Sequence, residues 1–430
     1  MSRIVAARLV RLVVPFRTSL RTADRHWTER RLGLVVLVDA DGRQGLGELA
    51  ADDAWDQPIW AAAELEVGAL VGREVAEAVE AAEAGGLVAA ISARQAGTRA
   101  GTRAGTRVLA AAISTAGLDL RARTAGRTLA AELEAWLDRQ PGEGSPGARQ
   151  SQGASGTSGP SVAGALGVPG VPGAFHLPVA GWSSSILPSV RVNALVGGDS
   201  TDERVRAALV AVGRGSTCLK LKVIPGVSAD ALVVSMRAVR DAVGPSVQLR
   251  LDANGAWTEE QAVDYVGALA DQRLDLEYVE QPVSPELGLA ALGRVRRAAQ
   301  VPIAADESVL DLAAAERLLA ANAADVLVVK PARVGGPLEA VRIARLAQAH
   351  GVPTVLSTLF ETGVGLAAAL HVAALLPGSG PAHGLDTLAL LADDLVLGGL
   401  RPVEGRLTLP PGPGLGVTID QAAVERYRVG

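Results

Sequence analysis

Cysteine is almost absent from the sequence. Cys218 is its single cysteine, which excludes an intramolecular disulfide and a zinc site built from several cysteines. Because Cys218 lies in an apolar, strand-like stretch, we interpret it as a packing residue rather than a reactive thiol. The low cysteine content is typical of a reducing cytoplasm, and residues 1–17 show no cleavage-site pattern of a secretory signal. We therefore expect a cytoplasmic protein.

Clustered positive charge and long apolar runs are also missing. The 41 basic and 46 acidic residues give a net charge of -5 and are interspersed, which argues against nucleic-acid binding and against a membrane-surface role. The longest apolar stretch, residues 364–376, is interrupted by His371 and is too short to span a bilayer. It predicts a buried helix. Aromatic residues make up only 3% of the chain, so an apolar core must be built mostly from Ala, Leu and Val.

The first 50 residues are typical of β structure. Residues 16–31 are polar and irregular, and we expect a loop there, either simply exposed or acting as a lid over a substrate. The expected strands cover residues 4–14, 32–38 and 44–49. The expected helices, which are Ala-rich and periodic, cover residues 61–84 and 107–138.

Two stretches have low complexity. Residues 96–107 repeat Ala-Gly-Thr-Arg in tandem, which predicts an extended loop or helix end, and residues 141–189 are rich in Gly, Ser and Pro with almost no charge. The second stretch is typical of a flexible insert rather than a packed element. We expect neither stretch to carry chemistry.

From Val190 onward, short β-rich runs alternate with helical stretches. This pattern indicates a parallel sheet covered on both faces, and seven such units within about 200 residues favour a closed barrel. A doubly wound open sheet is the alternative, but it would normally carry a Gly-rich phosphate-binding turn, and no such motif is present. The expected helices include residues 229–243, 259–271, 313–321 and 338–349.

Ionisable residues stand at the ends of these apolar runs. Starting from Lys222, the steps along the chain are 30, 28, 26 and 24 residues, each about one βα unit. Because the carboxyl ends of barrel strands converge on one mouth, where active sites form, these side chains are expected to share a pocket. They are Lys220, Lys222, Asp252, Glu280, Asp306 and Lys330.

Each residue alone has an ordinary explanation. An Asp after a strand is often a helix cap, Glu280 precedes Gln-Pro and fits a turn, and Lys330 precedes Pro and fits a solvated loop. Taken together, so many charges in apolar runs would be costly to bury unpaired. The remaining structural alternative is a buried ion-pair network without catalysis.

The residue types indicate proton chemistry on a carboxylate substrate. Asp252, Glu280 and Asp306 offer the oxygen ligands that suit Mg²⁺, with Mn²⁺ as an alternative. A metal at this place would acidify the proton next to a bound substrate carboxylate by stabilising the enediolate. A free lysine pKa of about 10.4 is too high for a base at neutral pH, but the metal or Lys220 would lower it at Lys222. Lys222 and Lys330 should flank the substrate on opposite faces.

These residues lie in motifs that resemble the enolase superfamily, in its muconate-lactonising subgroup. The motifs are Lys-Leu-Lys at 220–222, Leu-Asp-Ala-Asn-Gly-Ala-Trp at 251–257, Glu-Gln-Pro at 280–282, Ala-Asp-Glu-Ser at 305–308 and Lys-Pro-Ala-Arg-Val-Gly-Gly at 330–336. The resemblance covers residues 1–85 and 190–420. It assigns Mg²⁺ to the three carboxylates and acid/base work to the two lysines.

The resemblance also implies a domain arrangement in the α/β class. A modified (β/α)₇β TIM barrel is expected over residues 190–399, after an N-terminal α+β capping domain over residues 1–138. The C-terminal tail, residues 400–430, is expected to complete the capping domain, and residues 139–189 form the Gly/Ser/Pro-rich insert.

Within the subgroup, residues 16–38, 45–48, 383–396 and 402–407 are most similar to the o-succinylbenzoate synthases. This implies a syn dehydration of 2-succinyl-6-hydroxy-2,4-cyclohexadiene-1-carboxylate to o-succinylbenzoate for menaquinone synthesis. The alternative is an N-succinylamino acid racemase or a dipeptide epimerase on the same scaffold. Dipeptide epimerases carry Asp-x-Asp at the eighth strand, where this chain has Gly384-Leu385-Asp386, so Asp386 keeps that alternative open.

Four residues are expected to contact a small-molecule carboxylate substrate: Lys220, Asn254, Ser357 and Thr358. Ser357 and Thr358 stand where the family often has paired serines, and they would either bind the succinyl carboxylate or simply end a strand. No nucleic-acid or membrane partner is expected, and a homo-oligomer stays open.

Overall fold

The computed structural model describes residues 2–21, 26–51, 55, 57–83, 101–138, 185–224 and 226–429. The Gly/Ser/Pro-rich insert lies almost wholly outside these residues, as does the first part of the tandem repeat. The proposed domain limits at 138 and 190 therefore stay a prediction. None of the described helices combines the length and the apolar character needed to cross a membrane.

The N-terminal region is an antiparallel sheet in the order β1-β2-β3. Its strands are longer than expected: β1 covers Ile4–Arg21, β2 His26–Asp39 and β3 Gln44–Ala50. The prediction of a loop is wrong for residues 16–21 and 26–31, because these belong to β1 and β2, which pair again at Arg21 and His26 after an irregularity. Residues 22–25 lie outside the described residues. A polar strand pair that leaves the core lacks the apolar alternation by which strands are recognised.

Helices α1 (Gln57–Gly68), α2 (Val75–Glu83), α4 (Gly101–Thr124) and α5 (Leu129–Asp138) follow the sheet. Each expected helical stretch is thus divided in two by a turn. Helix α4 packs directly on β3. The two elements lie so close that a Cβ at Gly45 would collide with the backbone of Ala116, and a Cβ at Gly47 with that of Ala112. The end of the tandem repeat forms the start of α4, so the helix end, one of the two structures expected for the repeat, is the one observed.

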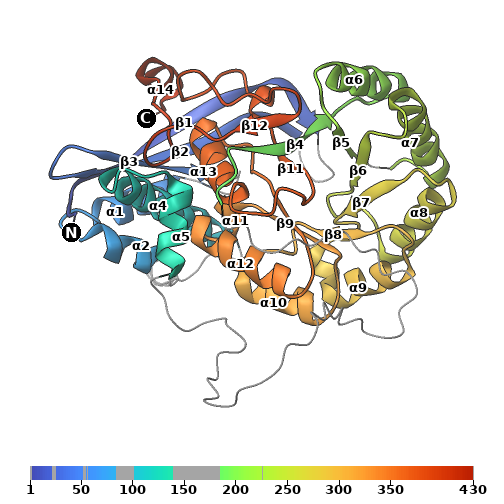
Figure 1. The fold of residues 1–430 in the computed structure, drawn as a ribbon, viewed down its shortest axis with the longest axis horizontal. Helices are drawn as coiled ribbons and strands as arrows, with labels where there is room; N and C mark the ends of the chain where they lie inside the picture. Colours follow the sequence, from blue (N-terminus) through green and yellow to red (C-terminus); the bar gives the residue numbers. More distant parts are fainter. Residues whose placement is uncertain are drawn as a thin grey trace, which may run out of the picture.

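The remaining chain forms the expected (β/α)₇β barrel (Figure 1). Its parallel strands run in the order β4 to β10 with β11 beside β4, and a bridge between Ser357 and Gly384 joins β10 to β11. The strands are β4 (Ser189–Val196), β5 (Cys218–Lys222), β6 (Gln248–Asp252), β7 (Leu276–Glu280), β8 (Ile303–Ala305), β9 (Val326–Val329), β10 (Thr354–Leu356) and β11 (His383–Asp386).

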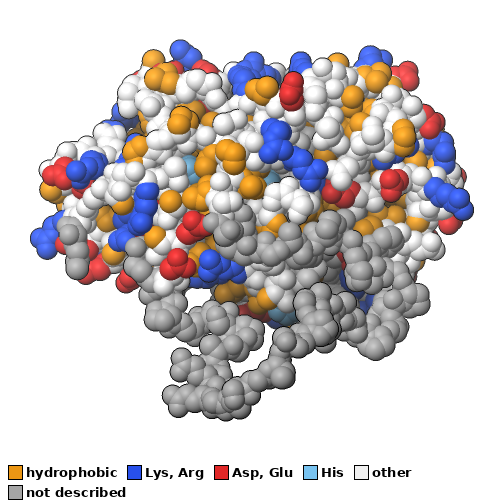
Figure 2. All heavy atoms as spheres, viewed as in Figure 1, with side chains coloured by type: hydrophobic (Ala, Val, Ile, Leu, Met, Phe, Trp, Pro, Cys, Tyr) orange, Lys and Arg blue, Asp and Glu red, His pale blue; other side chains and the backbone are white. Residues whose placement is uncertain are grey.

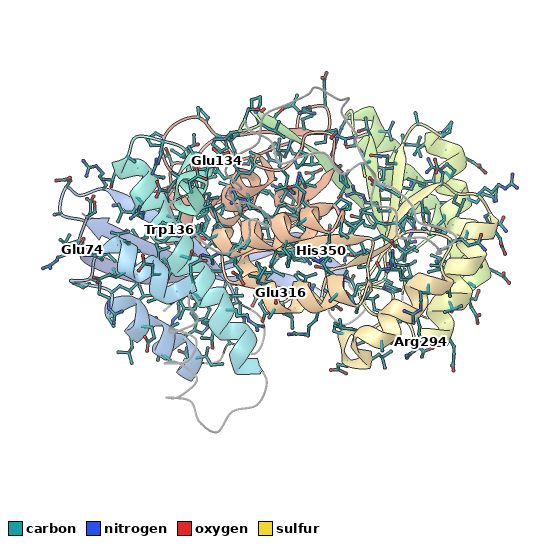
Figure 3. The ribbon with its side chains drawn as sticks, turned by 60° about the horizontal axis from the view of Figure 1, so that its bottom comes forward. Glu74, Glu134, Trp136, Arg294, Glu316 and His350 are labelled. Carbon is teal, nitrogen blue, oxygen red and sulfur yellow. The ribbon has the colours of Figure 1, made fainter. Side chains whose placement is uncertain are left out.

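The seven barrel helices are α6 (Thr201–Gly213), α7 (Ala229–Val243), α8 (Glu259–Asp271), α9 (Gly288–Ala298), α10 (Leu312–Ala320), α12 (Pro337–Ala349) and α13 (Gly363–Ala373). The four helices expected from periodicity agree with these bounds to within one residue. Capping boxes explain two of the starts, at Ser200 before α6 and Thr258 before α8. Figure 3 shows the capping helices with Glu74 at one end of the molecule and the barrel helices with Arg294 at the other.

The C-terminal tail returns to the N-terminal sheet. After β12 (Arg406–Thr408), which pairs with β4, the chain reaches α14 (Gln421–Tyr427). The Val429 amide then donates a hydrogen bond to the Arg11 carbonyl at 3.1 Å. On the face shown in Figure 2, side chains of both charge signs are scattered without a basic patch.

His371 and Cys218 are buried, as expected. The Nδ1 atom of His371 accepts a hydrogen bond from the Ala130 amide at 3.3 Å, so its Nε2 donates to the Leu415 carbonyl at 3.2 Å. Burial lowers the pKa of His371 to about 4, which keeps the ring neutral. Burial also raises the pKa of the Cys218 thiol to about 12, which fits a packing role.

Glu48 joins the N-terminal sheet to the barrel. Its carboxylate accepts hydrogen bonds from the Thr362 amide (2.8 Å), the Thr362 hydroxyl (2.7 Å) and the Gly365 amide (2.9 Å) at the start of α13. Burial raises the pKa of Glu48 to about 7 despite these bonds, and the charge of Glu361 adds to the rise.

Replacing Glu48 by Gln should therefore change how stability depends on pH. Between about pH 4.5 and 7 the folded protein keeps a proton on Glu48 that the unfolded chain releases, so the wild-type free energy of unfolding falls as the pH rises. Relative to Glu48→Gln, the wild type should lose up to about 3 kcal/mol over this range. Urea unfolding at pH 5 and 8 measures the difference.

The exposed Glu425 provides a control, since Glu425→Gln should not alter the pH dependence. A constant stability difference between the wild type and Glu48→Gln at the two pH values would contradict the prediction.

Candidate active site

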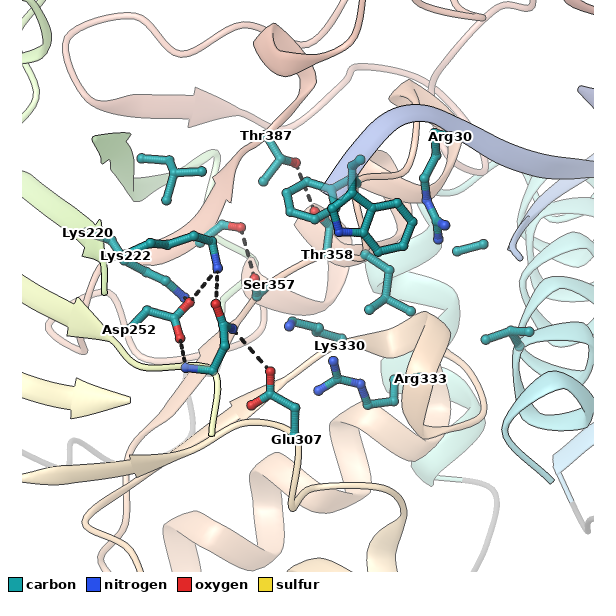
Figure 4. A pocket seen from close by; sticks show the side chains of 18 of the residues that line it. Arg30, Lys220, Lys222, Asp252, Glu307, Lys330, Arg333, Ser357, Thr358 and Thr387 are labelled. Atoms are coloured by element: carbon teal, nitrogen blue, oxygen red, sulfur yellow. Dashed lines mark hydrogen bonds and ion pairs between the residues drawn. The ribbon is translucent and has the colours of Figure 1, made fainter. Parts of the chain in front are cut away.

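A cavity of about 320 Å³ opens at the carboxyl ends of the barrel strands, facing the N-terminal sheet (Figure 4). Its barrel side includes Lys220, Lys222, Asp252 and Lys330. The sequence contains only three lysines, and all three line this cavity, whereas the other basic residues of the chain are arginines. Because arginine stays charged while a lysine amine can release its proton, the cavity holds all the basic side chains of the chain that are candidates for acid/base work other than histidine.

Strand register brings the charged strand ends together. Lys222 lies opposite Asp252 in the β5–β6 pair, and Asp252 lies opposite Glu280 in the β6–β7 pair. The Lys222 Nζ lies 3.0 Å from Asp252 Oδ2. The Lys220 Nζ lies between two carboxylates, 3.0 Å from Asp252 and 2.6 Å from Glu280.

Asp306 follows β8 and contacts two cations. Its Oδ2 lies 2.6 Å from the Lys330 Nζ, and its Oδ1 lies 2.7 Å from the Arg333 guanidinium. Arg333 belongs to the short helix α11 (Pro331–Val334), which begins directly after Lys330. Arg333 lies in the motif at residues 330–336, but the spacing of charged residues at strand ends did not predict its contact with Asp306.

Burial and neighbouring charge act in opposite directions on the three carboxylates, which are at most 2% exposed. Burial would raise the pKa of Asp252, but Lys220 and Lys222 hold it well below its usual range. Arg333 and Lys330 likewise overcome burial and lower the pKa of Asp306 to about 2. At Glu280, burial and the charge of Asp252 outweigh Lys220 and raise the pKa to about 7. The neighbouring cations thus compensate the charge of Asp252 and Asp306 more fully than that of Glu280.

Asn254 connects Lys222 to a further carboxylate. Its Oδ1 accepts a hydrogen bond from the Lys222 Nζ at 2.6 Å, and its Nδ2 donates to Glu307 at 3.2 Å. Burial, and then the charge of Asp306, raises the pKa of Glu307. Glu307 lines the cavity. It was missed in the sequence, because it follows the strand end and its contact is with Asn254, which is 53 residues away in the sequence.

The hydroxyls of Ser357 and Thr358 also line the cavity, but both contact protein groups. Ser357 donates to the Gly384 carbonyl at 3.3 Å, and Thr358 lies 2.8 Å from the Thr387 hydroxyl (Figure 4). Asp386 is on the same wall, where burial raises its pKa. This wall is therefore mostly neutral and polar, in contrast to the charged wall formed by β5 to β9.

The opposite wall comes from the N-terminal region. The ring centroid of Trp27 in β2 lies 6.3 Å from that of Phe360, and the ring centroid of Phe16 lies 5.7 Å from the same point. Three of the few aromatic residues of the chain thus gather near one side of the cavity. Arg30 and Arg107 also line it. Arg107, the last residue of the tandem repeat, pairs with Asp311.

The carboxylates fit Mg²⁺ by donor chemistry, although lysine ammoniums lie against them in this structure. Within the residues that the structure describes, no three His, Cys, Asp or Glu side chains form a group that could hold a metal ion. However, Glu280 Oε2 is buried and has no hydrogen-bond partner among the described residues. A hard divalent cation would give this atom a partner.

Comparisons with known proteins agree with the fold and the motifs. A family model described as enolase C-terminal domain-like matches residues 203–423. An o-succinylbenzoate synthase from Thermobifida fusca is 42% identical over 53% of this chain and 68% of its own length. An L-Ala-D/L-Glu epimerase from Bacillus subtilis is 33% identical over 51% of this chain and 59% of its own length.

Among solved structures, a dipeptide epimerase from Cytophaga hutchinsonii complexed with Mg and a dipeptide superposes with a TM-score of 0.76. The superposition covers 99% of this chain and 98% of that chain, at 22% identity. At this identity the likeness concerns the fold.

Replacing Lys220 by Met should make the carboxylates depend on Mg²⁺ for part of their charge compensation. Without the ammonium between Asp252 and Glu280, two buried carboxylates lose a partner, and we expect a loss of about 3 kcal/mol or more in stability. Millimolar Mg²⁺ should restore part of it, because the cation neutralises the same oxygens. Thermal unfolding with and without Mg²⁺ measures both effects. The same Mg²⁺-induced shift in the wild type and in Lys220→Met would contradict the prediction.

Proposed function

Because this chain belongs to the enolase superfamily, we propose that it is a Mg²⁺-dependent lyase of the o-succinylbenzoate synthase type. One observation carries the proposal. All three lysines of the chain line one cavity, and they lie beside three buried carboxylates. The 42% identity to an o-succinylbenzoate synthase supports the lyase over its alternatives.

On this proposal, Asp252, Glu280 and Asp306 hold Mg²⁺. The ion would supply charge stabilisation for the enediolate that forms when the substrate loses the proton next to its carboxylate. Binding requires the ammonium groups of Lys220, Lys222 and Lys330 to move off the carboxylate oxygens that they contact in this structure. Released in this way, Lys222 and Lys330 face the substrate.

Lys222 takes the proton and then returns it to the departing hydroxyl, which gives a syn elimination from one face of the ring. Asn254 holds the Lys222 amine by the 2.6 Å contact to its Oδ1. Lys330 stabilises the developing negative charge from the other wall. The cavity accepts 2-succinyl-6-hydroxy-2,4-cyclohexadiene-1-carboxylate, Ser357 and Thr358 contact its succinyl carboxylate, and the aromatic wall at Trp27 and Phe360 excludes water. The product, o-succinylbenzoate, would serve menaquinone synthesis in the cytoplasm.

A racemase or epimerase of an N-acylated amino acid or dipeptide is the second candidate. Asp386 in the cavity wall favours a dipeptide substrate in particular, since a carboxylate there offers a partner for the free amine of a dipeptide. In this reaction Lys330 would be the second acid/base rather than an electrostatic group. The B. subtilis epimerase relative is consistent with this candidate.

Arginine substitutions separate the two reactions. Lys222→Arg keeps the charge but removes the base, so the loss of diene absorbance should slow by about 10³-fold or more. Lys330→Arg keeps the charge that a lyase needs and should retain activity within about 100-fold. A racemase would lose its activity with either substitution.

The assay follows the cyclohexadiene substrate and, in parallel, N-succinyl amino acids and dipeptides in the presence of Mg²⁺. Arg294→Ala, at the far end of the barrel, is the control. Racemisation without loss of diene absorbance would replace the first candidate by the second, and no turnover of any of these substrates would contradict both.

A further inference from the structure

Gln281 is a buried amide between the ends of β7 and β8, and all its hydrogen-bonding capacity is used. Its Oε1 accepts from the Asp306 amide at 2.9 Å and from the Ser308 amide at 3.2 Å. Its Nε2 donates to the Ser308 hydroxyl and to the Val283 carbonyl, both at 2.9 Å. Two N–H donors on one side and a carbonyl on the other define which end of the amide is oxygen.

The backbone of Gln281 joins three strand ends. Its amide donates to the Ala304 carbonyl at 2.8 Å, and its carbonyl accepts from the Gly255 amide at 2.7 Å. One residue earlier, the Glu280 carbonyl accepts from the Ala253 amide at 3.0 Å. The backbone after each of the three carboxylate-bearing strands is therefore connected to Gln281 or to its direct neighbour.

This arrangement requires an unfavourable backbone conformation. Gln281 has a φ of 39°, in the left-handed region that side chains other than glycine rarely adopt. Such a conformation persists where surrounding contacts determine it, and it is often found at functional sites. A glutamate here would turn an oxygen toward the Val283 carbonyl and add a charge beside Glu280, while an asparagine would be too short to reach both partners.

We propose that Gln281 is a positioning residue that holds Glu280 and Asp306 at the separation required for a divalent cation. The inference rests on the proposed function, since it concerns the same metal site. Glu280 and Asp306 repel each other when both are ionised, and the hydrogen bonds that the Gln281 side-chain oxygen accepts from the Asp306 and Ser308 amides oppose their separation. The amide does this without adding charge of its own.

Gln281→Met tests this role, because it keeps the length of the side chain but removes its hydrogen bonds. We expect the Kd for Mn²⁺, measured from the EPR signal of the free ion, to rise by about tenfold or more. Gln421→Met, at an exposed position at the start of α14, is the matched control and should leave the Kd unchanged. Circular dichroism and thermal unfolding check that each variant is folded at the temperature of the measurement.

Ser308→Ala is the second variant, since it removes one hydrogen bond to Gln281 with little change in volume. It should raise the Kd for Mn²⁺ by a smaller factor, and it tests the same role if Gln281→Met does not fold. A folded Gln281→Met or Ser308→Ala protein with the wild-type Kd would overturn the positioning role while leaving the proposed function intact. A wild-type protein that binds no Mn²⁺ and no Mg²⁺ would instead overturn the metal-dependent function, and the positioning role with it.

Discussion

Neutralisation of buried negative charge at the ends of β6, β7 and β8 is the constraint on which the rest of the site depends. Asp252, Glu280 and Asp306 are almost completely removed from solvent, where an unpaired carboxylate would cost several kcal/mol. The fold meets this cost with the three lysines and Arg333. A barrel provides such an arrangement readily, because parallel register places the last residue of each strand beside the last residue of the next.

The same charge balance explains how the site can take part in chemistry. The ammonium groups of Lys222 and Lys330 contact carboxylate oxygens that a divalent cation would also bind, so the cation and the lysines would compete for the same oxygens. Binding of the cation would free amines that face the cavity. The cavity is completed from the other side by the N-terminal region. Glu48 of β3 connects this region to the start of α13, and the Ala130 amide of α5 connects it to His371 near the end of α13.

The barrel and the charged residues could be predicted from the sequence because both depend on local patterns. Apolar runs of four or five residues mark the strands, and a charge at the end of each run marks the mouth. Family resemblance narrowed the chemistry further. Glu307 and Arg107 could not be assigned in this way, since their place in the cavity wall depends on contacts with segments distant in the sequence.

The parts of β1 and β2 within residues 16–31 were missed for a related physical reason. Most of their described residues are exposed, so these parts are stabilised by backbone pairing and by contacts of Phe16 and Trp27 with Phe360 rather than by an alternating apolar face. A sequence pattern reports burial, and strands without a buried face carry little of that signal. The positive φ of Phe360, 62°, is equally invisible in the sequence.

The most direct test of this account is the lysine ¹³Cε–¹Hε NMR spectrum of the protein labelled only at lysine, recorded during a Mg²⁺ titration. Because the chain has three lysines, the spectrum reports on the candidate site alone. If the cation replaces the ammonium groups at the carboxylates, the signals of Lys220, Lys222 and Lys330 should all shift with one common Kd. Signals that do not change at saturating Mg²⁺ would contradict the account.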